Sequence, residues 1–321
     1  MIRDTRTPTL SLASRRFRAI ALMVLAAVAA PVAAADTPSA AVPHAPEVRL
    51  AGEIVTLPIV MVREYPFIEG EVAGVKGKLM LDTGMGEPFV INDHRVPMTG
   101  GTKIGTGFFG SGQTFDIRLQ AGVDGVRIGA LRYPRVTNVQ SQDARMLERI
   151  TPDFLGWVGQ AAFASHAMKL DYRRLTATFY KGGPEAFTRG ETVIAVLPFE
   201  TRKLPNIPLL PARIGDLDAI VSLDTGMNGS LAISEEKRQR LVAAGLIKPT
   251  QDPEAFDLHG VRIAGMAAAT FPAIEVEEGP SPSAKSVGIT EDTELELGYV
   301  FLRNYKTVWD YRAKRLYLLA P

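Results

Sequence analysis

The 321-residue sequence contains no cysteine. This absence excludes disulfides, a thiol nucleophile and a cysteine-based zinc site, so the fold must depend on its apolar core. A Gly-x-Ser-x-Gly motif is also absent, which argues against a serine hydrolase of that type. The histidines lie far apart, without metal-ligand spacing, and we expect surface or core roles for them. They are His44, His94, His166 and His259.

The sequence also lacks an apolar run long enough to cross a membrane. Three arginines between positions 15 and 18 precede an apolar stretch over residues 19–30, and small residues follow at 33–35. About a dozen apolar residues fall short of the roughly 20 that span a bilayer. A membrane anchor is the alternative interpretation, but the pattern predicts a cleaved secretory signal over residues 1–35 and thus a periplasmic or secreted protein.

Neither sign of charge predominates once this segment is removed. Residues 1–35 hold five Arg and one Asp, which leaves 31 basic (36 − 5) and 34 acidic (35 − 1) side chains. The mature chain thus has no surplus of basic side chains of the kind that would indicate nucleic acid or an anionic membrane as a partner. We expect residues 36–49, rich in Pro and Ala, to form an unstructured lead-in.

What the sequence does contain is Asp-Thr-Gly twice, at the ends of apolar runs in residues 81–85 and 223–227. Strand-forming residues precede and follow each copy, so each aspartate is expected in a tight loop between strands, where glycine permits the backbone conformation. An aspartate in a tight turn is commonly structural, because its side chain bonds nearby amides. The matched pair instead indicates two facing aspartates, Asp82 and Asp224.

A second pair of blocks repeats in the same order. Gly159 and Asp171 are 12 residues apart (171 − 159), as are Gly298 and Asp310 (310 − 298). Each of these aspartates lies 89 (171 − 82) or 86 (310 − 224) residues after its Asp-Thr-Gly aspartate, and we expect a structural role for both. The repeat predicts a mainly β chain built from two copies of one lobe. The predicted lobes are residues 50–183 and 190–321.

These motifs together resemble the aspartic peptidases, the retropepsin-like and pepsin-like clan with its bacterial exported two-lobe members. The resemblance implies two tandem acid-protease lobes in a monomer, with a cleft between them that binds a peptide or protein substrate. It also implies an aspartic-type endopeptidase that needs no metal or cofactor. The implied site residues are the catalytic Asp82 and Asp224, the loop-locking Thr83 and Thr225, and Gly84 and Gly226, whose amides face the carboxylates.

Three positions depart from the family pattern. Met85 and Met227 stand where a small or hydroxylated residue is usual, and Glu296 places a charge in an apolar-apolar-Gly block. A methionine cannot donate a hydrogen bond to a carboxylate. A catalytically inactive peptide-binding module of the same fold therefore remains an alternative, and a structural β-rich periplasmic domain is a third.

The sequence also predicts a flap, a helix and a set of buried aromatic residues. The Gly-rich segment 100–112 is a candidate flap, with Gly107, Phe108 and Phe109 toward substrate, although an ordinary hairpin tip has the same composition. No equivalent Gly-rich hairpin is visible in the second lobe. A helix is expected over residues 234–244, capped by Ser234. We expect three aromatic residues to pack in the cores: Phe67, Phe199 and Trp309.

Overall fold

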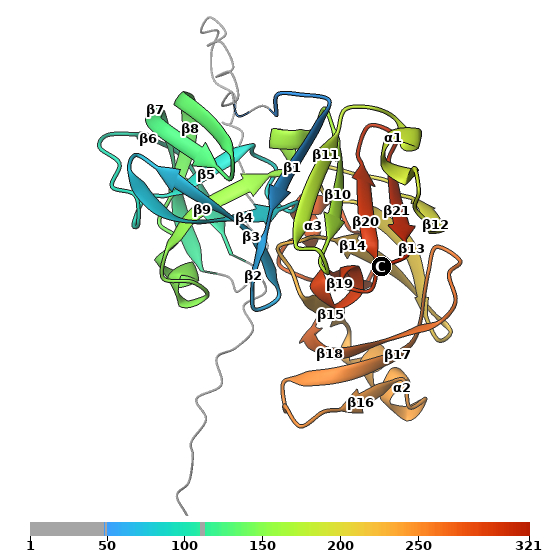
Figure 1. The fold of residues 1–321 in the computed structure, drawn as a ribbon. Helices are drawn as coiled ribbons and strands as arrows, with labels where there is room; N and C mark the ends of the chain where they lie inside the picture. The colour runs from blue at the N-terminus through green and yellow to red at the C-terminus, as the bar shows by residue number, and fades with distance from the viewer. Residues whose placement is uncertain (1–47, 49, 110–112) are drawn as a thin grey trace, which may run out of the picture.

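The computed structural model describes residues 48, 50–109 and 113–321. The predicted signal and all of the lead-in except Val48 lie outside the described residues. The described chain is mainly β and forms two similar six-stranded barrels in tandem (Figure 1). Within this part of the chain, no helix is long and apolar enough to cross a membrane.

The first barrel is closed by a pairing between its first and last strands. In spatial order its strands are β3 (Tyr65–Val72), β4 (Val75–Asp82), β9 (Phe154–Gly159), β5 (Phe89–Asn92), β8 (Leu131–Gln142) and β7 (Thr114–Ile128). Strand β7 returns to β3 where Ile128 pairs with Gly70. Four smaller elements complete this half: β2 (Val60–Val62), β6 (Thr102–Phe108) and the 3-10 helices η1 (Arg145–Arg149) and η2 (Gln160–Phe163).

The second barrel repeats this plan. In the same spatial order its strands are β13 (Leu209–Ile214), β14 (Leu217–Leu223), β19 (Thr293–Leu297), β15 (Gly229–Ile233), β18 (Ala269–Glu278) and β17 (Ala255–Ile263). Strand β17 closes on β13, where Ile214 pairs with Val261. The remaining elements are β16 (Ile247–Pro249), α2 (Glu235–Ala243), α3 (Ala284–Val287) and α4 (Tyr299–Leu302). As predicted, Ser234 caps α2, accepting a hydrogen bond from Lys237 N at 3.4 Å.

Equivalent strands pair in the same way in both barrels. Strands β4 and β14 carry the residues before Asp-Thr-Gly, and each runs parallel to a strand that leads to the later glycine of the repeat. Leu81 pairs with Val158 in the first barrel, and Leu223 pairs with Leu297 in the second. The internal duplication predicted from the sequence is thereby confirmed.

A separate six-stranded sheet joins the two halves of the chain. Its order is β1 (Ile54–Pro58), β11 (Thr176–Tyr180), β10 (Ala167–Asp171), β20 (Lys306–Asp310), β21 (Arg315–Leu319) and β12 (Val193–Pro198), with α1 (Pro184–Thr188) between β11 and β12 in the chain. The central strands β10 and β20 are antiparallel, so equivalent strands meet across an approximate twofold axis. Asp171 accepts hydrogen bonds from the amides of Arg173 and Arg174, and Asp310 accepts one from Ala313, as expected for turn residues.

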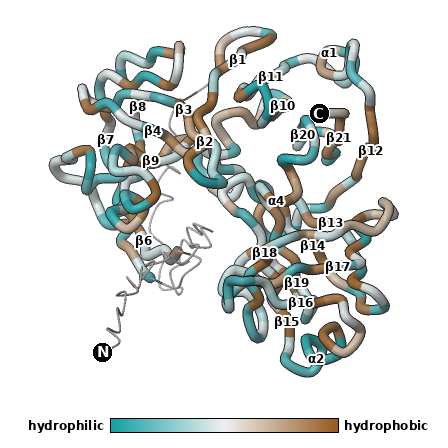
Figure 2. Tube along the Cα trace, turned by 60° about the horizontal axis from the view of Figure 1, so that its bottom comes forward, coloured by the Kyte–Doolittle hydropathy of each residue, from teal (hydrophilic) through white to brown (hydrophobic). Residues whose placement is uncertain are grey.

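The apolar residues of the strands fill the core. Phe67 and Trp309 are fully buried and Phe199 is nearly so, which confirms the prediction for these three aromatics. Figure 2 shows hydrophobic residues recurring along the strands of both barrels. Burying one such side chain contributes about 1.5–3 kcal/mol, so the strands are held mainly by this core.

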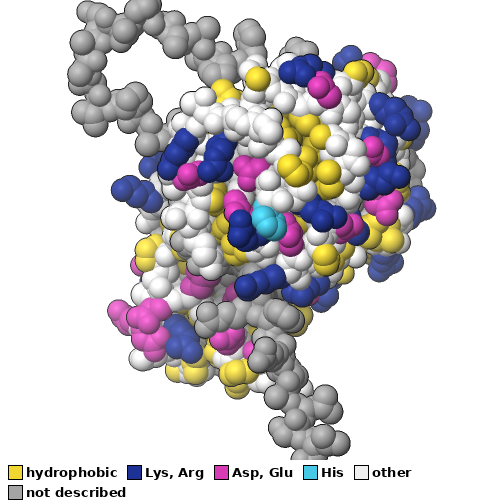
Figure 3. All heavy atoms as spheres, turned by 90° about the vertical axis from the view of Figure 1, so that its left-hand side faces the viewer, with side chains coloured by type: hydrophobic (Ala, Val, Ile, Leu, Met, Phe, Trp, Pro, Cys, Tyr) yellow, Lys and Arg dark blue, Asp and Glu magenta, His cyan; other side chains and the backbone are white. Residues whose placement is uncertain are grey.

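The outer face of the first barrel carries charges of both signs. Figure 3 shows Lys and Arg side chains interleaved with Asp and Glu across this face, with no continuous patch of one sign. The surface in that view therefore offers no strongly charged area for a polyanion or a polycation.

Candidate active site

The two Asp-Thr-Gly loops lie against each other between the barrels. Thr83 N donates to Thr225 Oγ1 at 2.9 Å, and Thr225 N donates to Thr83 Oγ1 at 3.0 Å. Thr225 Oγ1 donates in turn to the carbonyl of Leu81 at 2.8 Å. Both threonines are fully buried. These reciprocal bonds join loops from different barrels and fix their relative position.

The aspartates of the two loops share one backbone donor. Gly84 N lies 2.8 Å from Oδ1 of Asp82 and 2.8 Å from Oδ1 of Asp224. A methyl group on Gly84 would lie 2.1 Å from Asp224 Oδ2, and one on Gly226 would lie 2.7 Å from Asp82 Cγ. Each carboxyl group therefore packs against the glycine of the opposite loop, an approach that a larger residue would prevent.

The remaining donors differ between the two aspartates. Besides the shared amide, the donor to Asp82 Oδ1 among the described residues is Met85 N, at 3.1 Å. Asp224 Oδ1 accepts from Gly226 N at 2.8 Å and from Thr83 Oγ1 at 3.3 Å. The Oδ2 atoms of both aspartates are buried and have no hydrogen-bond partner of ordinary geometry within the described part of the chain. Three donors thus stabilise the Asp224 carboxylate, against two for Asp82.

Burial raises the pKa of both aspartates, but the other groups that act on the pKa differ between the two. At Asp82, burial raises the pKa and the negative charge of Asp224 raises it further, so the pKa of Asp82 lies well above its ordinary value. For Asp224, burial raises the pKa, but the hydrogen bond from Gly226 N and the other donors oppose this rise. Two carboxyl groups this close hold one proton between them and titrate as a unit. The donor pattern favours the proton on Asp82 and the negative charge on Asp224.

Two residues that the sequence did not single out support the first loop. Asn206, on the segment before β13, donates through Nδ2 to the carbonyls of Thr83 at 3.1 Å and Gly84 at 2.7 Å. Tyr311 Oη donates to the carbonyl of Asn206 at 3.1 Å. Tyr311 directly follows Asp310 of the second repeated block, and Tyr172 follows Asp171 in the first, so the sequence offered a signal for it, whereas nothing around Asn206 marks that residue. The second half of the chain therefore holds the loop of the first.

Met85 and Met227 occupy equivalent positions behind the aspartates. Both side chains are buried. The carbonyl of Met85 accepts from Gln160 N at 2.8 Å at the start of η2, and that of Met227 accepts from Tyr299 N at 2.9 Å at the start of α4. The methionine backbone thus ties each loop to the helix that follows the later glycine. The thioether leaves Oδ2 of each aspartate without the hydroxyl donor that serine or threonine would supply.

The candidate flap is the hairpin of β6 and β7. Gly107 pairs with Phe115 on β7, and Phe109 stacks on Phe115 with ring centroids 4.6 Å apart. Phe109 is buried and belongs to the same apolar cluster as Met85, the residue that follows the first Asp-Thr-Gly. The side chain of Phe108 and residues 110–112 lie outside the described part of the structure. The equivalent hairpin of the second barrel, β16 and β17, is not Gly-rich and has only a short first strand.

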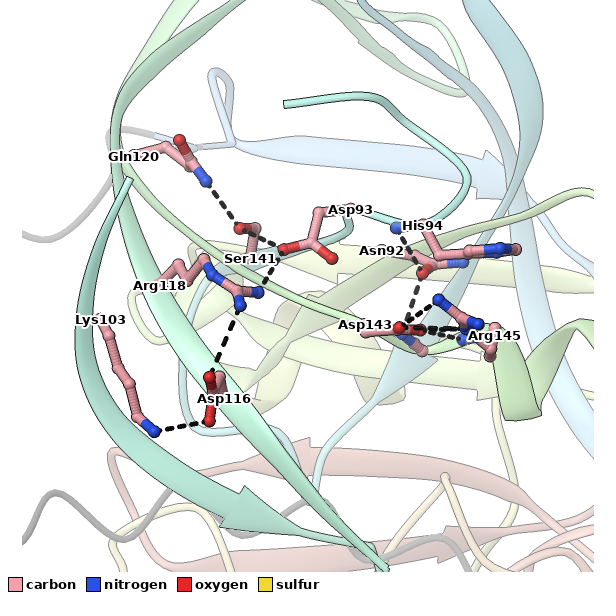
Figure 4. A network of polar contacts seen from close by, with 11 residues as sticks. Asn92, Asp93, His94, Lys103, Asp116, Arg118, Gln120, Ser141, Asp143 and Arg145 are labelled. Atoms are coloured by element: carbon pink, nitrogen blue, oxygen red, sulfur yellow. Dashed lines mark hydrogen bonds and ion pairs between the residues drawn. The ribbon is translucent and has the colours of Figure 1, made fainter. Parts of the chain in front are cut away.

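A polar network holds this hairpin to the barrel (Figure 4). Arg118 on β7 contacts Asp93 at 3.4 Å and Asp116 at 3.5 Å. Ser141 on β8 donates to the same Asp93 carboxylate at 3.0 Å, and Lys103 on β6 lies 2.7 Å from Asp116. Arg118 therefore connects β7 to the loop after β5, and Lys103 joins β6 to β7 through Asp116.

Glu296 is buried near the second loop. Ser230 Oγ donates to its Oε2 at 3.1 Å, and Ser283 Oγ donates to its Oε1 at 3.2 Å. Burial, followed by the charges of nearby carboxylates, places the pKa of Glu296 well above its ordinary value. The departure seen in the sequence is thus a buried, hydrogen-bonded acid rather than a surface charge.

These raised pKa values predict that the protein is less stable at pH 8 than at pH 5. Folded Asp82 and Glu296 bind protons more tightly than the unfolded chain does, so stability falls as pH rises from about 4 through the folded pKa values. Each unit of raised pKa costs about 1.4 kcal/mol above that window. Urea unfolding at both pH values measures the difference.

Glu296→Gln should reduce this pH dependence, since it removes one of the groups responsible. Glu291, held by Arg202 at a pKa of about 2, is ionised at both pH values and does not contribute. Equal stability of the parent protein at pH 5 and pH 8 would contradict the prediction.

Comparison of the sequence with protein-family models and with curated proteins gives no match. The function of the protein is therefore inferred from the geometry of the two loops. Among the described residues, no group of three or more His, Asp or Glu side chains is arranged to hold a metal ion.

Proposed function

We propose that the protein is an exported aspartic endopeptidase that cleaves peptide bonds with Asp82 and Asp224. The observation that supports this most is the pair of buried carboxyl groups joined through the amide of Gly84, with both Oδ2 atoms lacking a hydrogen-bond partner among the described residues. Buried polar atoms without partners are rare, and in the proposed mechanism a water and a substrate carbonyl would supply the missing partners. Export is inferred from the signal pattern of residues 1–35.

In this mechanism Asp224 is the base and Asp82 is the acid. The Asp224 carboxylate takes a proton from a water, whose oxygen attacks the peptide carbonyl carbon, while Asp82 gives its proton to the carbonyl oxygen. The resulting gem-diol intermediate then collapses: Asp224 gives its proton to the amide nitrogen, one hydroxyl gives its proton to Asp82 as the carbonyl re-forms, and the C–N bond breaks to release the amine. The proton count balances, since the pair again holds one proton after product release.

The alternative is an inactive peptide-binding module of the same fold. Two features support this alternative. Met85 and Met227 supply no hydroxyl donor beside the aspartates, and Glu296 places an acid where an apolar residue is usual. A peptide-library digestion with residues 36–321, from pH 3 to pH 8, separates the two proposals. We expect internal cleavage of some peptides. Binding without cleavage at every pH would favour the alternative.

The two methionines are predicted to set the acidic limit of activity. Without a hydroxyl donor, the ionised form of the pair is less stabilised, so its lower apparent pKa is higher and the acidic limit of activity lies at a higher pH. Replacing Met85 and Met227 by Thr should lower that pKa. The acidic limb of the kcat/KM profile should then move to lower pH. An unchanged limb in a folded, active variant would show that the methionines only shape the site.

A monomer is expected to be the active species, because both aspartates come from one chain. The central β10–β20 pairing already places the two halves about an internal twofold axis. Sedimentation velocity, run at the concentrations of the activity assay, should give one species of monomer mass. Activity that rises with the square of protein concentration would instead indicate an obligate dimer.

A further inference from the structure

Asn206 contacts two consecutive peptide groups of the first Asp-Thr-Gly loop. Its Nδ2 atom donates to the carbonyl of Thr83 at 3.1 Å and to that of Gly84 at 2.7 Å. Carbonyl oxygens only accept, so the nitrogen of the carboxamide must face them, and its two hydrogens provide one bond for each. Asn206 is 2% exposed, so both bonds form away from bulk solvent, where they are stronger.

The same two peptide groups supply the backbone donors of Asp82. The amide that begins with the carbonyl of Thr83 ends in Gly84 N, which donates to Oδ1 of both aspartates at 2.8 Å. The amide that begins with the carbonyl of Gly84 ends in Met85 N, which donates to Asp82 Oδ1 at 3.1 Å. In a planar trans peptide the N–H and C=O groups point in opposite directions. Asn206 therefore holds these amides from the side opposite the carboxyl groups.

Gly84 is the reason that these peptide groups need to be held. A methyl group at Gly84 would lie 2.1 Å from Asp224 Oδ2, so no larger residue fits between the loops. Glycine has the fewest steric limits on φ and ψ, and the two peptide planes that meet at its Cα can therefore turn more easily than elsewhere. Turning either plane would direct its N–H away from the carboxyl groups. Two hydrogen bonds from one planar carboxamide restrict both planes.

Asn206 is itself fixed by the sheet that joins the two halves of the chain. Pro205 precedes it and restricts the backbone of the segment. Tyr311 Oη donates to the Asn206 carbonyl at 3.1 Å. The Tyr311 ring stacks on Trp309 of β20, with centroids 6.3 Å apart, and Trp309 is fully buried. A chain of contacts thus leads from the central sheet through Asn206 to the first loop.

The equivalent positions of the first half carry different chemistry. Strand register makes Leu209 equivalent to Phe67, because each pairs with the residue two before its Asp-Thr-Gly aspartate. Three residues earlier in each half, Glu64 occupies the place of Asn206. A carboxylate has no donor for a backbone carbonyl. The tyrosine of the first repeated block, Tyr172, has a buried hydroxyl without a hydrogen-bond partner in the described part of the chain.

We propose that Asn206 is a positioning residue for the aspartate pair, which holds the peptide groups on either side of Gly84 so that their N–H groups stay directed at the carboxyl groups. The proposal rests on the proposed function, since this pair is the one that would cleave the peptide. Each bond from Asn206 also polarises the amide that accepts it and strengthens the donor at its other end. Loss of Asn206 therefore weakens the donors to the ionised pair and raises its lower apparent pKa.

Other titratable groups near the pair do not obscure this change. Burial raises the pKa of each group on which the charge of Asp224 acts, namely Tyr65, Tyr172, Tyr311 and Glu296. The three tyrosines therefore stay neutral throughout the acidic range. Glu296 also stays neutral there, because its pKa lies well above its ordinary value. A shift of the acidic limb of activity thus reports the aspartate pair.

The pH profile of Asn206→Leu tests the proposal, because leucine has nearly the same shape as asparagine but no donor. We expect kcat to fall by about a hundredfold with KM nearly unchanged, since the loop that carries the reacting groups is displaced. The acidic limb of kcat/KM should move to higher pH by about half a unit or more. Asn206→Gln, which keeps the donor on a longer side chain, should recover part of the activity and reduce the shift.

Two tyrosine variants form a matched pair. Tyr311→Phe removes the donor to the Asn206 carbonyl, so it should move the acidic limb in the same direction by a smaller amount. Tyr172→Phe removes a hydroxyl that has no hydrogen-bond partner among the described residues, so it should leave the profile unchanged. Equal effects of the two variants would contradict the role given to the contact between Tyr311 and Asn206.

NMR of the aspartate carboxyl carbons keeps the outcomes distinct, because it requires no hydrolysis. The signals of the pair are assigned with Asp82→Asn and Asp224→Asn, and their lower apparent pKa should rise in Asn206→Leu. If this pKa rises although the parent protein cleaves nothing, only the peptidase proposal fails. If Asn206→Leu does not fold by circular dichroism, Asn206→Ser and Tyr311→Phe are measured in its place. Reduced activity with an unchanged limb and an unchanged pKa would show a merely structural role and overturn the proposal.

Discussion

Replacing either Asp82 or Asp224 by Asn is expected to lower kcat/KM on a cleaved peptide by about a thousandfold or more. One residue supplies the base and the other the acid of a single device that holds one proton, so neither works alone. The double variant should be scarcely less active than either single variant, because the two groups act as a unit. Steady-state kinetics on one peptide from the library digestion measures all three.

The control for this prediction is Asp218→Asn. Asp218 lies on β14, the strand that leads to Asp224, but its side chain is exposed and, among the described residues, its ion-pair partner is Arg213. This variant should keep the parent kinetics, and circular dichroism should show every variant folded. A single variant at Asp82 or Asp224 with near-parent turnover would disprove the proposed pair of catalytic aspartates.

Gly298→Ala is expected to have the largest effect on stability. A methyl group at Gly298 would lie 1.9 Å from the carbonyl oxygen of Met227 and 2.5 Å from that of Asp224. Both contacts are with backbone, so no side-chain rotation relieves them, and the second loop must move. We expect a loss of about 3–5 kcal/mol in the free energy of unfolding, with loss of activity. Urea denaturation followed by tryptophan fluorescence measures it.

Gly183→Ala is the matched control for this change. Gly183 precedes α1 with a negative φ, and a methyl group there would meet no atom within 4 Å. Its effect should stay within about 0.5 kcal/mol. If Gly298→Ala were no more destabilising than Gly183→Ala, the close packing of the second loop against β19 would be wrong.

The two Asp-Thr-Gly loops have similar geometry, but the hydrogen bonds made to their carboxyl groups differ. Loop geometry is nearly symmetric at Thr83 and Thr225, which exchange equivalent bonds. The carboxyl environments are not symmetric, because Thr83 Oγ1 donates to Asp224 while Thr225 Oγ1 donates to a backbone carbonyl. This difference favours the negative charge on Asp224, since each additional donor favours the ionised form.

The sequence by itself determined the duplication, the mainly β class and the aspartate pair. These features depend on short patterns, Asp-Thr-Gly after an apolar run and a later glycine, that carry their own local structure. The capped helix over residues 234–244 and the three core aromatics follow from equally local rules. For these features the residues that decide the outcome are neighbours in the chain.

Only the tertiary structure decided which groups contact the aspartates. Asn206 bonds the loop at Thr83 and Gly84, yet it lies more than a hundred residues away, with no motif around it. Strand register likewise places β10 beside β20 in the shared sheet. It also pairs Glu296 with Ser222 on one side and with Ser230 on the other. A one-residue change of register would turn each side chain to the opposite face, and the sequence pattern does not state the register. The charge of Glu296 was visible in the sequence, but its burial beside Asp224 was fixed by strands that meet only in the folded chain.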